Sequence, residues 1–449
     1  MTVLPPFRRS DAPDFAGPLP QAVDLCIIGG GVIGISTALF AARAGLRVCV
    51  LEKGRVAAEQ SSRNWGWIRV QGRDVSEIPI ALEAQRLWHG LEAEAKGRLG
   101  LKQIGLSYLA RTEADLAGQA GWIAQAARFG VSTRMLSRAE TLAALGQPRG
   151  PWIGAMHTPT DLKAEPWQAV PELARMARAE GAVIVEHCAV RALERSAGRV
   201  TGVVTEHGPL RAEQVVLAGG AWSSLFLRRH GVDIPQLSVR CTALSTGPLP
   251  QILPTGAVDD RMAMRPRDDG GYTLAPAAYA ELFLGPDVVR HLRHYLPLAL
   301  SGEFDTYLRP PAPKGYPDAF STPRQWASDQ QSPFERMRIL DPAPSIAHVS
   351  ELKRRFAQAY PQMGAVTTAQ AWAGMIDVLP DVVPVVDHVA ALPGLIVATG
   401  MCGHGFGIGP AFGRILADMA QGRAPGHDLG RFTMARFFDG TRLRPGPNL

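Results

Sequence analysis

The stretch VDLCIIGGGVIGISTALFAARAGLRVCVLE, from Val23 to Glu52, predicts a complete strand, turn, helix and strand. The apolar run Val23–Ile28 is typical of a short buried strand. The small-residue segment Ile35–Ala44 indicates a helix, which Gly45 ends. The run Arg47–Leu51 then predicts a second strand.

Three glycines of this stretch, Gly29, Gly31 and Gly34, stand in G-x-G-x-x-G spacing before the helix. Gly29 permits a tight turn, Gly31 lets a pyrophosphate approach the main chain, and Gly34 lets the helix pack close to the strand. Glu52 follows the second strand, where a carboxylate accepts both hydroxyls of an adenosine ribose and repels a 2′-phosphate. A glycine-rich turn without a ligand would not explain Glu52. The stretch therefore predicts a dinucleotide site.

The composition of the 449 residues, 46% hydrophobic and 20% charged, is that of a soluble globular protein. The formal net charge is +6, but the arginines are scattered, so nothing indicates nucleic-acid binding. Five widely separated cysteines suggest neither a disulfide framework nor a metal site and fit a reducing compartment. The N-terminus lacks a signal-peptide core, and no stretch has the roughly 18 apolar residues of a membrane span. We expect a cytoplasmic protein with a flexible leader over residues 1–20, or one that is peripheral at the inner face of a membrane.

The polar loop AAEQSSRNWGWIRVQGRD, residues 57–74, is the first loop after Glu52 and is placed to run along an extended ligand. Its hydroxyls Ser61 and Ser62 suit diphosphate or ring oxygens. Trp65 and Trp67 carry large apolar faces that rarely stay in water. The alternative is a loop that is anchored by two tryptophans and contacts no ligand.

Periodicity predicts further helices at 78–99 and 114–129, and one that begins at Glu165 and Pro166 and that Pro171 should delay or kink. Strands are predicted at 106–110, 183–187, 190–195, 200–206 and 214–217. The small residues of 218–223 either meet a ligand or form a glycine-rich connection. Near the C-terminus a strand at 395–399, a loop with five glycines at 400–409 and a helix at 412–419 follow one another. Such a loop brings backbone N–H groups and a helix N-terminus to one point, and its His404 either assists them or is simply packed.

Five motifs occur in a specific order: the G-x-G-x-x-G with Glu52, SSRN at 61–64, VVLAGGAWS at 215–223, WAGMID at 372–377 and ATGMCGHGF at 398–406. Together they resemble the D-amino-acid oxidase, glycine oxidase and sarcosine oxidase family of FAD enzymes, over residues 24 to about 422. The resemblance implies an α/β, Rossmann-like FAD-binding domain of the glutathione-reductase type. It also implies an interleaved α+β substrate domain on a mostly antiparallel sheet.

On this reading, residues 21–82, 155–236 and 366–436 form the FAD-binding domain, residues 83–154 and 237–365 form the substrate domain, and residues 437–449 form a tail. Strands within 237–264 and 271–284 and helices at 288–299 and 350–360 belong to the substrate domain. The proline-rich segment 304–344 shows no clear period and has no assigned role.

The resemblance implies that FAD is held by residues from all of these motifs, without a metal. The expected contacts are Gly29, Gly31, Val32, Ile33, Gly34, Glu52, Lys53, Ser61, Ser62, Arg63, Asn64, Trp65, Val190, Ala218, Gly219, Trp222, Gly374, Asp377, Gly400, Gly403, His404, Gly405, Phe406 and Gly407. The N–H groups of the C-terminal loop, aimed at flavin N1 and the C2 carbonyl, would stabilise the anionic reduced ring.

The chemistry that the resemblance implies is hydride transfer to flavin N5 from the carbon beside an amine, followed by hydrolysis of the imine. The protein must exclude water and bind the substrate carboxylate, usually through an arginine fork. The candidates are Arg69, beside the loop, and Arg240, Arg265 and Arg267 on predicted substrate-domain strands. Tyr272 and His404 are further candidates for the catalytic site.

Three departures from the sarcosine oxidases bear on function. The cysteine that carries a covalent flavin is absent, since Gly374 and Met375 stand there, which implies noncovalent FAD. Gly407 replaces a carboxylate-binding lysine, and Tyr272 or Thr273 replaces an oxygen-activating lysine. The sequence therefore favours a dehydrogenase that passes electrons to a quinone or another carrier.

The first hypothesis is an FAD-dependent dehydrogenase of D-amino acids or imino acids. The second is an oxidase of secondary amines or polyols that uses O2, and the third is a flavin-binding subunit of a larger assembly. An NAD-dependent enzyme is weaker, because a second nucleotide fingerprint is missing. The substrate is a small amino acid or amine in the first two cases, and the oligomeric state is left open.

Overall fold

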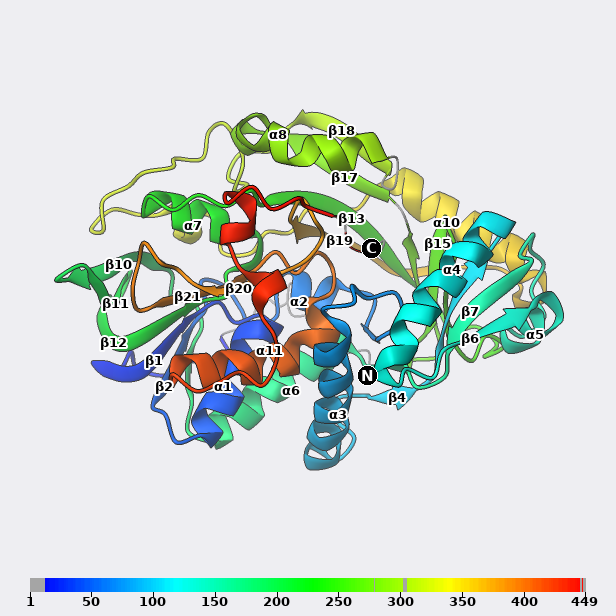
Figure 1. Ribbon diagram of the computed structural model, residues 1–449, viewed down its shortest axis with the longest axis horizontal. Coiled ribbons are helices and arrows are strands. Elements are labelled where there is room, and N and C mark those ends of the chain that lie inside the picture. The colour runs from blue at the N-terminus through cyan, green and yellow to red at the C-terminus, as the bar shows by residue number, and fades with distance from the viewer. Residues whose placement is uncertain (1–12, 278, 302–304, 445, 447–449) are drawn as a thin grey trace.

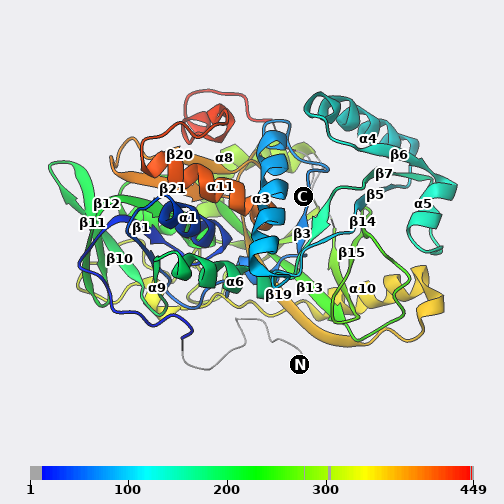
Figure 2. The same ribbon diagram turned by 90° about the horizontal axis from the view of Figure 1, so that it is seen from below.

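The computed structural model describes residues 13–277, 279–301, 305–444 and 446. Within these residues the chain forms two large sheets at opposite ends of its long axis, as Figures 1 and 2 both show. The strands β10, β11 and β12 mark one end, and β6 and β7 mark the other.

The first sheet has the strand order β10-β11-β12-β1-β2-β9, and β21 and β20 continue it beside β12. Its strands are β1 (Ala22–Ile28), β2 (Val48–Leu51), β9 (Val183–Val185), β10 (Val190–Ser196), β11 (Arg199–Thr205), β12 (Gly208–Leu217), β20 (Val385–His388) and β21 (Leu395–Thr399). β1 lies parallel to β12 on one side and to β2 on the other. A central parallel strand is covered on both faces, which explains the burial of the apolar residues Leu25, Cys26 and Ile27.

Three helices cover one face of this sheet, α1 (Val32–Arg43), α6 (Pro166–Ala179) and α11 (Gly405–Ala420), and a fourth, α3 (Ile78–Ala95), lies beside them. α1 packs between α6 and α11, and α11 also packs on α3 (Figure 2). Pro166 opens α6 as predicted, but Pro171 does not delay the helix.

The predicted glycine-rich loop at 400–409 is shorter than expected, because α11 already begins at Gly405. The physical reason is close helix packing. A Cβ at Gly409 would lie 2.7 Å from Val32, and one at Gly413 would lie 2.4 Å from the Cβ of Ser36, both on α1. These glycines therefore let α11 approach α1 and do not signal a loop.

The second sheet has the strand order β18-β17-β13-β16-β15-β14-β5-β7-β6, with β19 on β13. Its strands are β5 (Leu106–Ala110), β6 (Arg134–Ser137), β7 (Gly154–Thr158), β13 (Leu237–Thr246), β14 (Gly256–Val258), β15 (Met262–Pro266), β16 (Tyr272–Pro276), β17 (Tyr279–Leu284), β18 (Asp305–Pro311) and β19 (Thr368–Val378). Its pairs are antiparallel except for β14 with β5 and β17 with β18. The α/β layer and the mostly antiparallel sheet confirm the predicted fold class.

A small sheet, β3 (Trp67–Ile68), β8 (Leu162–Lys163) and β4 (Lys102–Gln103), lies between the two large ones. The remaining helices are α2 (Gln60–Arg63), α4 (Glu113–Ala126), α5 (Arg138–Ala144), α7 (Ser223–Arg229), α8 (Pro286–Ser301), α9 (Pro333–Arg336) and α10 (Ile346–Ala359). The segment 304–344, for which no period was found, contains β18 and α9 within its described residues.

The sheets divide the chain differently from two of the predicted boundaries. β7 and β19 were assigned largely to the FAD-binding domain, but both belong to the second sheet. The rest of the domain division stays a prediction.

Of the predicted flexible leader, residues 1–12 lie outside the described residues, whereas Phe15 is buried and Ala16 forms a bridge with Val185. The part of the leader that the structure describes is therefore docked. In the predicted tail, residues 445 and 447–449 lie outside the described residues.

Candidate functional site

A cavity runs from the turn after β1 to the strands β13 and β17 of the second sheet and to the start of α11. The predicted cofactor residues that line it are Gly29, Gly31, Val32, Ile33, Glu52, Lys53, Ser61, Arg63, Asn64, Trp65, Val190, Ala218, Gly219, Trp222, Gly374, Asp377, Gly403, His404, Gly405 and Phe406. The cavity thus brings together residues that are far apart in the sequence and come from every predicted motif.

Four predicted cofactor residues are not among the lining residues. Gly34 packs against the turn, since a Cβ there would lie 2.0 Å from the carbonyl oxygen of Gly29. A Cβ at Gly400 would lie 2.2 Å from Leu379, and one at Gly407 would lie 3.1 Å from the carbonyl oxygen of Trp67. Ser62 donates its hydroxyl to the carbonyl oxygen of Glu59. The structure thus gives these four residues packing roles beside the cavity.

Glu52 lies at one end of the cavity with both carboxylate oxygens bonded to the main chain. Oε2 accepts from the N–H of Gly30 and Oε1 from that of Gly54, each at 2.7 Å. Burial raises the pKa of Glu52 to about 6. Each carboxylate oxygen can accept more than one hydrogen bond, so the group can still receive hydroxyl donors from a ligand.

The turn between β1 and α1 is open to a ligand because its residues have no bulk. Gly29 has φ +112°, and a Cβ there would lie 2.4 Å from the carbonyl oxygen of Ala218. Gly31 is the N-cap residue of α1, and the N–H of Val32 in its first turn donates to Ser61 Oγ at 2.9 Å. A helix N-terminus with such a turn is a preformed binding site for phosphate groups.

The loop after α2 forms one wall of the cavity. The rings of Trp65 and Trp67 meet edge to face with their centroids 5.0 Å apart, and both line the cavity. Arg63 is anchored through hydrogen bonds to the carbonyl oxygens of Ala58 and Ala373. The loop is therefore held to both β19 and its own start, and it presents an apolar aromatic surface.

Arg69 follows this loop, lines the cavity and is 7% exposed. Its Nη1 donates to the carbonyl oxygen of Gln71 at 2.5 Å, and its guanidinium lies 5.4 Å from the ring centroid of Tyr108. It makes no ion pair with a carboxylate of the described part of the chain. The nearby carboxylate of Asp161 accepts hydrogen bonds from the N–H groups of Val70 and Gln71 instead. A buried guanidinium without a carboxylate partner is suited to an anionic ligand.

A second arginine and an acid–histidine pair lie at the same end, at the start of α11. Arg73 and His404 line the cavity, and His404 Nδ1 lies 3.6 Å from Oε1 of the fully buried Glu77. Arg73 Nη1, both carboxylate oxygens of Glu77 and both ring nitrogens of His404 are buried without hydrogen-bond partners among the described residues. Burial and, after it, the charge of Arg73 lower the pKa of His404 to about 4, so its ring is neutral at pH 7.

Asp377, on β19, lines the cavity and is bonded to the loop before α11. Its Oδ2 accepts from the N–H of Gly400 at 2.7 Å, whereas Oδ1 is buried without a partner in the part of the chain described. Burial raises the pKa of Asp377. Gly374 on the same strand lines the cavity, where a Cβ would lie 3.4 Å from Arg63.

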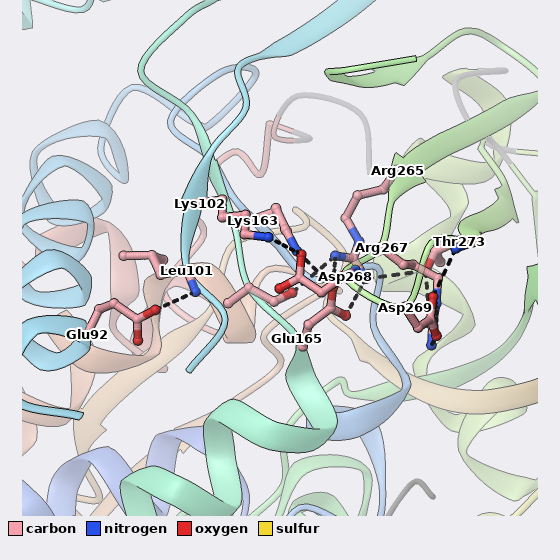
Figure 3. Close-up of polar contacts among 12 residues, drawn as sticks. Glu92, Leu101, Lys102, Lys163, Glu165, Arg265, Arg267, Asp268, Asp269 and Thr273 are labelled. Atoms are coloured by element: carbon pink, nitrogen blue, oxygen red, sulfur yellow. Dashed lines mark hydrogen bonds and ion pairs between the residues drawn. The ribbon is translucent and has the colours of Figure 1, made fainter. Parts of the chain in front are cut away.

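Two of the arginines predicted as carboxylate clamps are placed away from the cavity and already neutralised. Arg265 is 1% exposed and forms a two-point ion pair with Glu165, at 3.0 and 2.9 Å, which Figure 3 shows within a larger ionic network. Arg240 donates to the buried Glu281 at 2.7 Å. Neither lines the cavity, so the structure corrects both predictions. Arg267 also lies outside it and pairs with Asp269.

Tyr272 is the other predicted catalytic residue that the structure places elsewhere. Its ring is buried against Phe356, and its hydroxyl donates to the carbonyl oxygen of Pro250 at 2.9 Å. It does not line the cavity. The strand that carries Tyr272 was matched to the family through its sequence alone, and its buried side belongs to the core of the second sheet.

Sequence reasoning missed Arg73 and Glu77 as residues of this site. No sequence signal identified them, because Arg69, Arg73 and Glu77 lie in the irregular segment before α3, where a spacing of four residues defines no common face. His404, which lies beside them, was predicted.

The family model described as FAD dependent oxidoreductase, DAO, matches residues 24–419. This chain belongs to that family. The membership confirms the predicted resemblance and identifies an FAD-dependent oxidoreductase, whose relatives include oxidases and dehydrogenases.

Among relatives of the flavoenzyme, glycine oxidase of Geobacillus kaustophilus is 25% identical over 425 residues, which cover 92% of this chain and 97% of that protein. Mitochondrial sarcosine dehydrogenase of Mus musculus is 27% identical over 280 residues, 59% of this chain, but the chain spans only 30% of that longer protein. The solved structure of L-amino acid deaminase from Proteus myxofaciens in complex with anthranilate has a TM-score of 0.90 at 29% identity, covering 96% of this chain and 97% of that one.

The cavity of the flavoenzyme fits FAD on its own features. The turn lines the cavity with Gly29 and Gly31, which have no side chains to block a ligand, Glu52 stands where ribose hydroxyls need acceptors, and Asp377 offers an unpartnered buried oxygen. Glu52 would hold the ribose, the start of α1 the diphosphate, and the start of α11 the pyrimidine side of the flavin.

We expect replacement of Glu52 by alanine to weaken FAD binding about tenfold to a hundredfold, because the ribose loses charge-assisted hydrogen bonds that are worth roughly 1.5 to 3 kcal/mol. Glu52→Gln, which keeps one acceptor oxygen, should lose less. Titration of FAD into the apoprotein, followed by quenching of flavin fluorescence, measures both constants. Wild-type dissociation constants in both variants would show that the ribose is not bound by Glu52.

Proposed function

We propose that this flavoenzyme is a dehydrogenase that oxidises the C–N bond of an amino acid or imino acid and passes the electrons to a quinone or another carrier. The observation that carries the proposal is Arg69, a buried cation at the cavity wall without a carboxylate partner among the described residues. An amino-acid carboxylate would supply the missing partner. Bound FAD supplies the hydride acceptor, and every other part of the reaction depends on how the chain positions the substrate.

Arg69 and the two tryptophans near it would bind and orient the substrate. Arg69 would fix the carboxylate, and the faces of Trp65 and Trp67 would exclude water and select a cyclic or bulky side chain. Hydride loss needs the substrate amine in its neutral form. A neutral His404 at this end of the cavity places no negative charge there that would stabilise the protonated amine. A pocket of this type does not need a strong base.

The absence of a flavin-linking cysteine supports noncovalent binding of FAD. Gly374 and Met375 lie on β19, and Gly374 lines the cavity. Cys26, Cys49, Cys188 and Cys402 are buried and do not line the cavity, whereas Cys241 lines it. Burial raises the pKa of Cys241 to about 12, which makes its thiol a poor nucleophile.

We expect acid precipitation of the purified yellow protein to release all of its flavin into the supernatant as FAD, because no activated cysteine is available to hold it. Absorbance of the supernatant and of the redissolved pellet measures the partition. Flavin that remained in a washed pellet would contradict noncovalent binding.

The electron acceptor is inferred from the part of the cavity wall that the second sheet forms. The second sheet contributes Thr242, Ala243, Pro276, Ala277, Tyr279 and Ala280 to it, and the described residues of this sheet that line the cavity include no lysine or arginine. A cation beside the flavin would favour reduction of O2 to superoxide. Its absence from this wall supports a carrier other than O2, and an O2-using oxidase of secondary amines is the alternative.

A panel of D- and L-amino acids, N-methyl amines and cyclic imino acids tests the proposal with an artificial dye acceptor and an oxygen electrode. We expect bleaching of the flavin by one carboxylate-bearing amine under anaerobic conditions and turnover with the dye that greatly exceeds oxygen uptake. Rapid oxygen uptake would identify an oxidase. Failure of every amine to bleach the flavin would favour a non-catalytic flavin-binding subunit.

A further inference from the structure

Helix α8 presents a stripe of apolar side chains to solvent, while several of its polar side chains point into the protein. Val289, Leu292, Leu296 and Leu300 are spaced by about one turn each and form an outward stripe, with 74%, 59%, 49% and 77% of their surfaces exposed. The inner side carries Asp287 and His291, which are buried, and Tyr295, whose hydroxyl donates to the carbonyl oxygens of Pro235 and Val378. This arrangement is the reverse of that of a helix whose outer face stays in water.

Exposed large apolar side chains are concentrated around this helix. Of the ten such side chains in the described residues, eight lie between Leu284 and Phe320, and the ring of a ninth, Phe438, lies 6.2 Å from that of His294 on α8. Figure 1 shows α8 and β18 along the same upper edge of the molecule. Single exposed apolar residues are ordinary, but a concentration of this kind marks a contact surface.

The charges beside the stripe are basic. Arg290 and Arg293 are exposed on α8, and neither forms an ion pair with a carboxylate of the described residues. The acidic residue of the helix, Asp287, points inward and is bound by Arg228. No helix in the described part of the chain is long and apolar enough to cross a membrane.

We propose that the stripe of α8 (Val289, Leu292, Leu296 and Leu300) docks on the surface of a membrane that contains anionic lipids. The four apolar side chains would enter the boundary between head groups and acyl chains, while Arg290 and Arg293 would contact lipid phosphates. A helix of 16 residues with one apolar stripe gives reversible attachment in the plane of the surface. The proposal goes beyond the proposed function, and its test does not depend on turnover.

The experiment is flotation of the FAD-loaded protein with vesicles of phosphatidylcholine alone and of phosphatidylcholine mixed with phosphatidylglycerol. Leu292→Glu/Leu296→Glu removes half of the stripe at exposed positions, and Arg290→Glu/Arg293→Glu reverses the charge. Ala117→Glu/Ala124→Glu, at exposed positions of α4, adds the same two charges on another helix. Turnover with a soluble dye and the flavin content verify that each variant is folded.

We expect the wild type and the α4 control to float with the anionic vesicles and to dissociate as salt is raised. Both α8 variants should bind at least tenfold more weakly, because each basic residue near an anionic surface, like each buried apolar side chain, contributes substantially to attachment. Absence of vesicle binding by the wild type at low salt would overturn the proposal. So would a wild-type dimer, seen by light scattering, that Leu292→Glu/Leu296→Glu converts to a monomer, since the stripe would then bind a second copy of the chain.

Discussion

Replacement of Arg69 by alanine is expected to lower kcat/KM for an amino-acid substrate by roughly 30-fold to 5,000-fold. Loss of one partner of a buried ion pair costs about 2 to 5 kcal/mol, and in this variant the substrate carboxylate would enter a dry pocket unpaired. Arg69→Lys keeps the charge but loses the planar fork, so its loss should be intermediate. Steady-state kinetics with a dye acceptor measure each value.

The discriminating comparison for Arg69 is the uncharged amine analogue of the same substrate. Alanine at this position should change its kcat/KM little, because the analogue has no carboxylate to pair. Arg134→Ala, at an arginine whose side chain is 61% exposed on β6, is a matched control that should leave both substrates unaffected. Equal losses with the acid and with the amine would mean that Arg69 positions the flavin or the loop, and the proposed clamp would fail.

The cofactor end of the site was predictable from the sequence because its chemistry is local. Gly29, Gly31 and Glu52 lie within one strand–helix–strand unit, and the structure places all three at the cavity. The glycines near the C-terminus were misread as a long loop, since a glycine that opens a turn and one that lets two helices touch look alike in a sequence. The space available for a Cβ at Gly409 and Gly413 distinguishes the two cases.

The substrate end was less predictable because an arginine's role depends on which carboxylate reaches it. Arg265 is paired with Glu165, one hundred residues away, and Arg240 is paired with Glu281 from a neighbouring strand. Neither pairing can be read from one sequence. Arg69 has no such partner among the described residues, and this difference separates it from Arg265 and Arg240 only once the chain is folded.

The ionic network around Glu165 predicts the largest loss of stability. Lys163 Nζ lies 2.9 Å from Oε1 of Glu165, and the guanidinium of Arg265 pairs with both carboxylate oxygens (Figure 3). The side chains of Glu165 and Arg265 are each 1% exposed, and that of Lys163 is 2% exposed. The network joins the start of α6 to β15 and the hairpin that follows it. It therefore connects a helix that covers the first sheet with the second sheet.

Glu165→Gln is expected to lower the free energy of unfolding by about 3 to 5 kcal/mol, because it leaves the buried Arg265 without its carboxylate. Lys163 loses one partner and keeps its ion pair with Asp268. Thermal and urea midpoints measure the loss. Glu351→Gln, on α10, is the matched control. Its side chain is 36% exposed and that of its partner Arg354 is 54% exposed, so the change should cost less than about 1 kcal/mol. Similar midpoints for the two variants would show that the buried network contributes no more than a surface pair.

The same network predicts how the stability gap between wild type and Glu165→Gln depends on pH. Although burial alone raises the pKa of Glu165, the charges of Arg265 and Lys163 hold it at about 2. In the unfolded chain a glutamate has a pKa of about 4.3. Because the folded-state pKa is the lower one, the ionised carboxylate stabilises the fold fully above pH about 5 and progressively less as pH falls toward 2. The gap should therefore be constant from pH 8 to about 5 and should narrow below it, down to the lowest pH at which both proteins remain folded. A gap that stayed constant down to that pH would show that the charge of Glu165 is not what stabilises this junction.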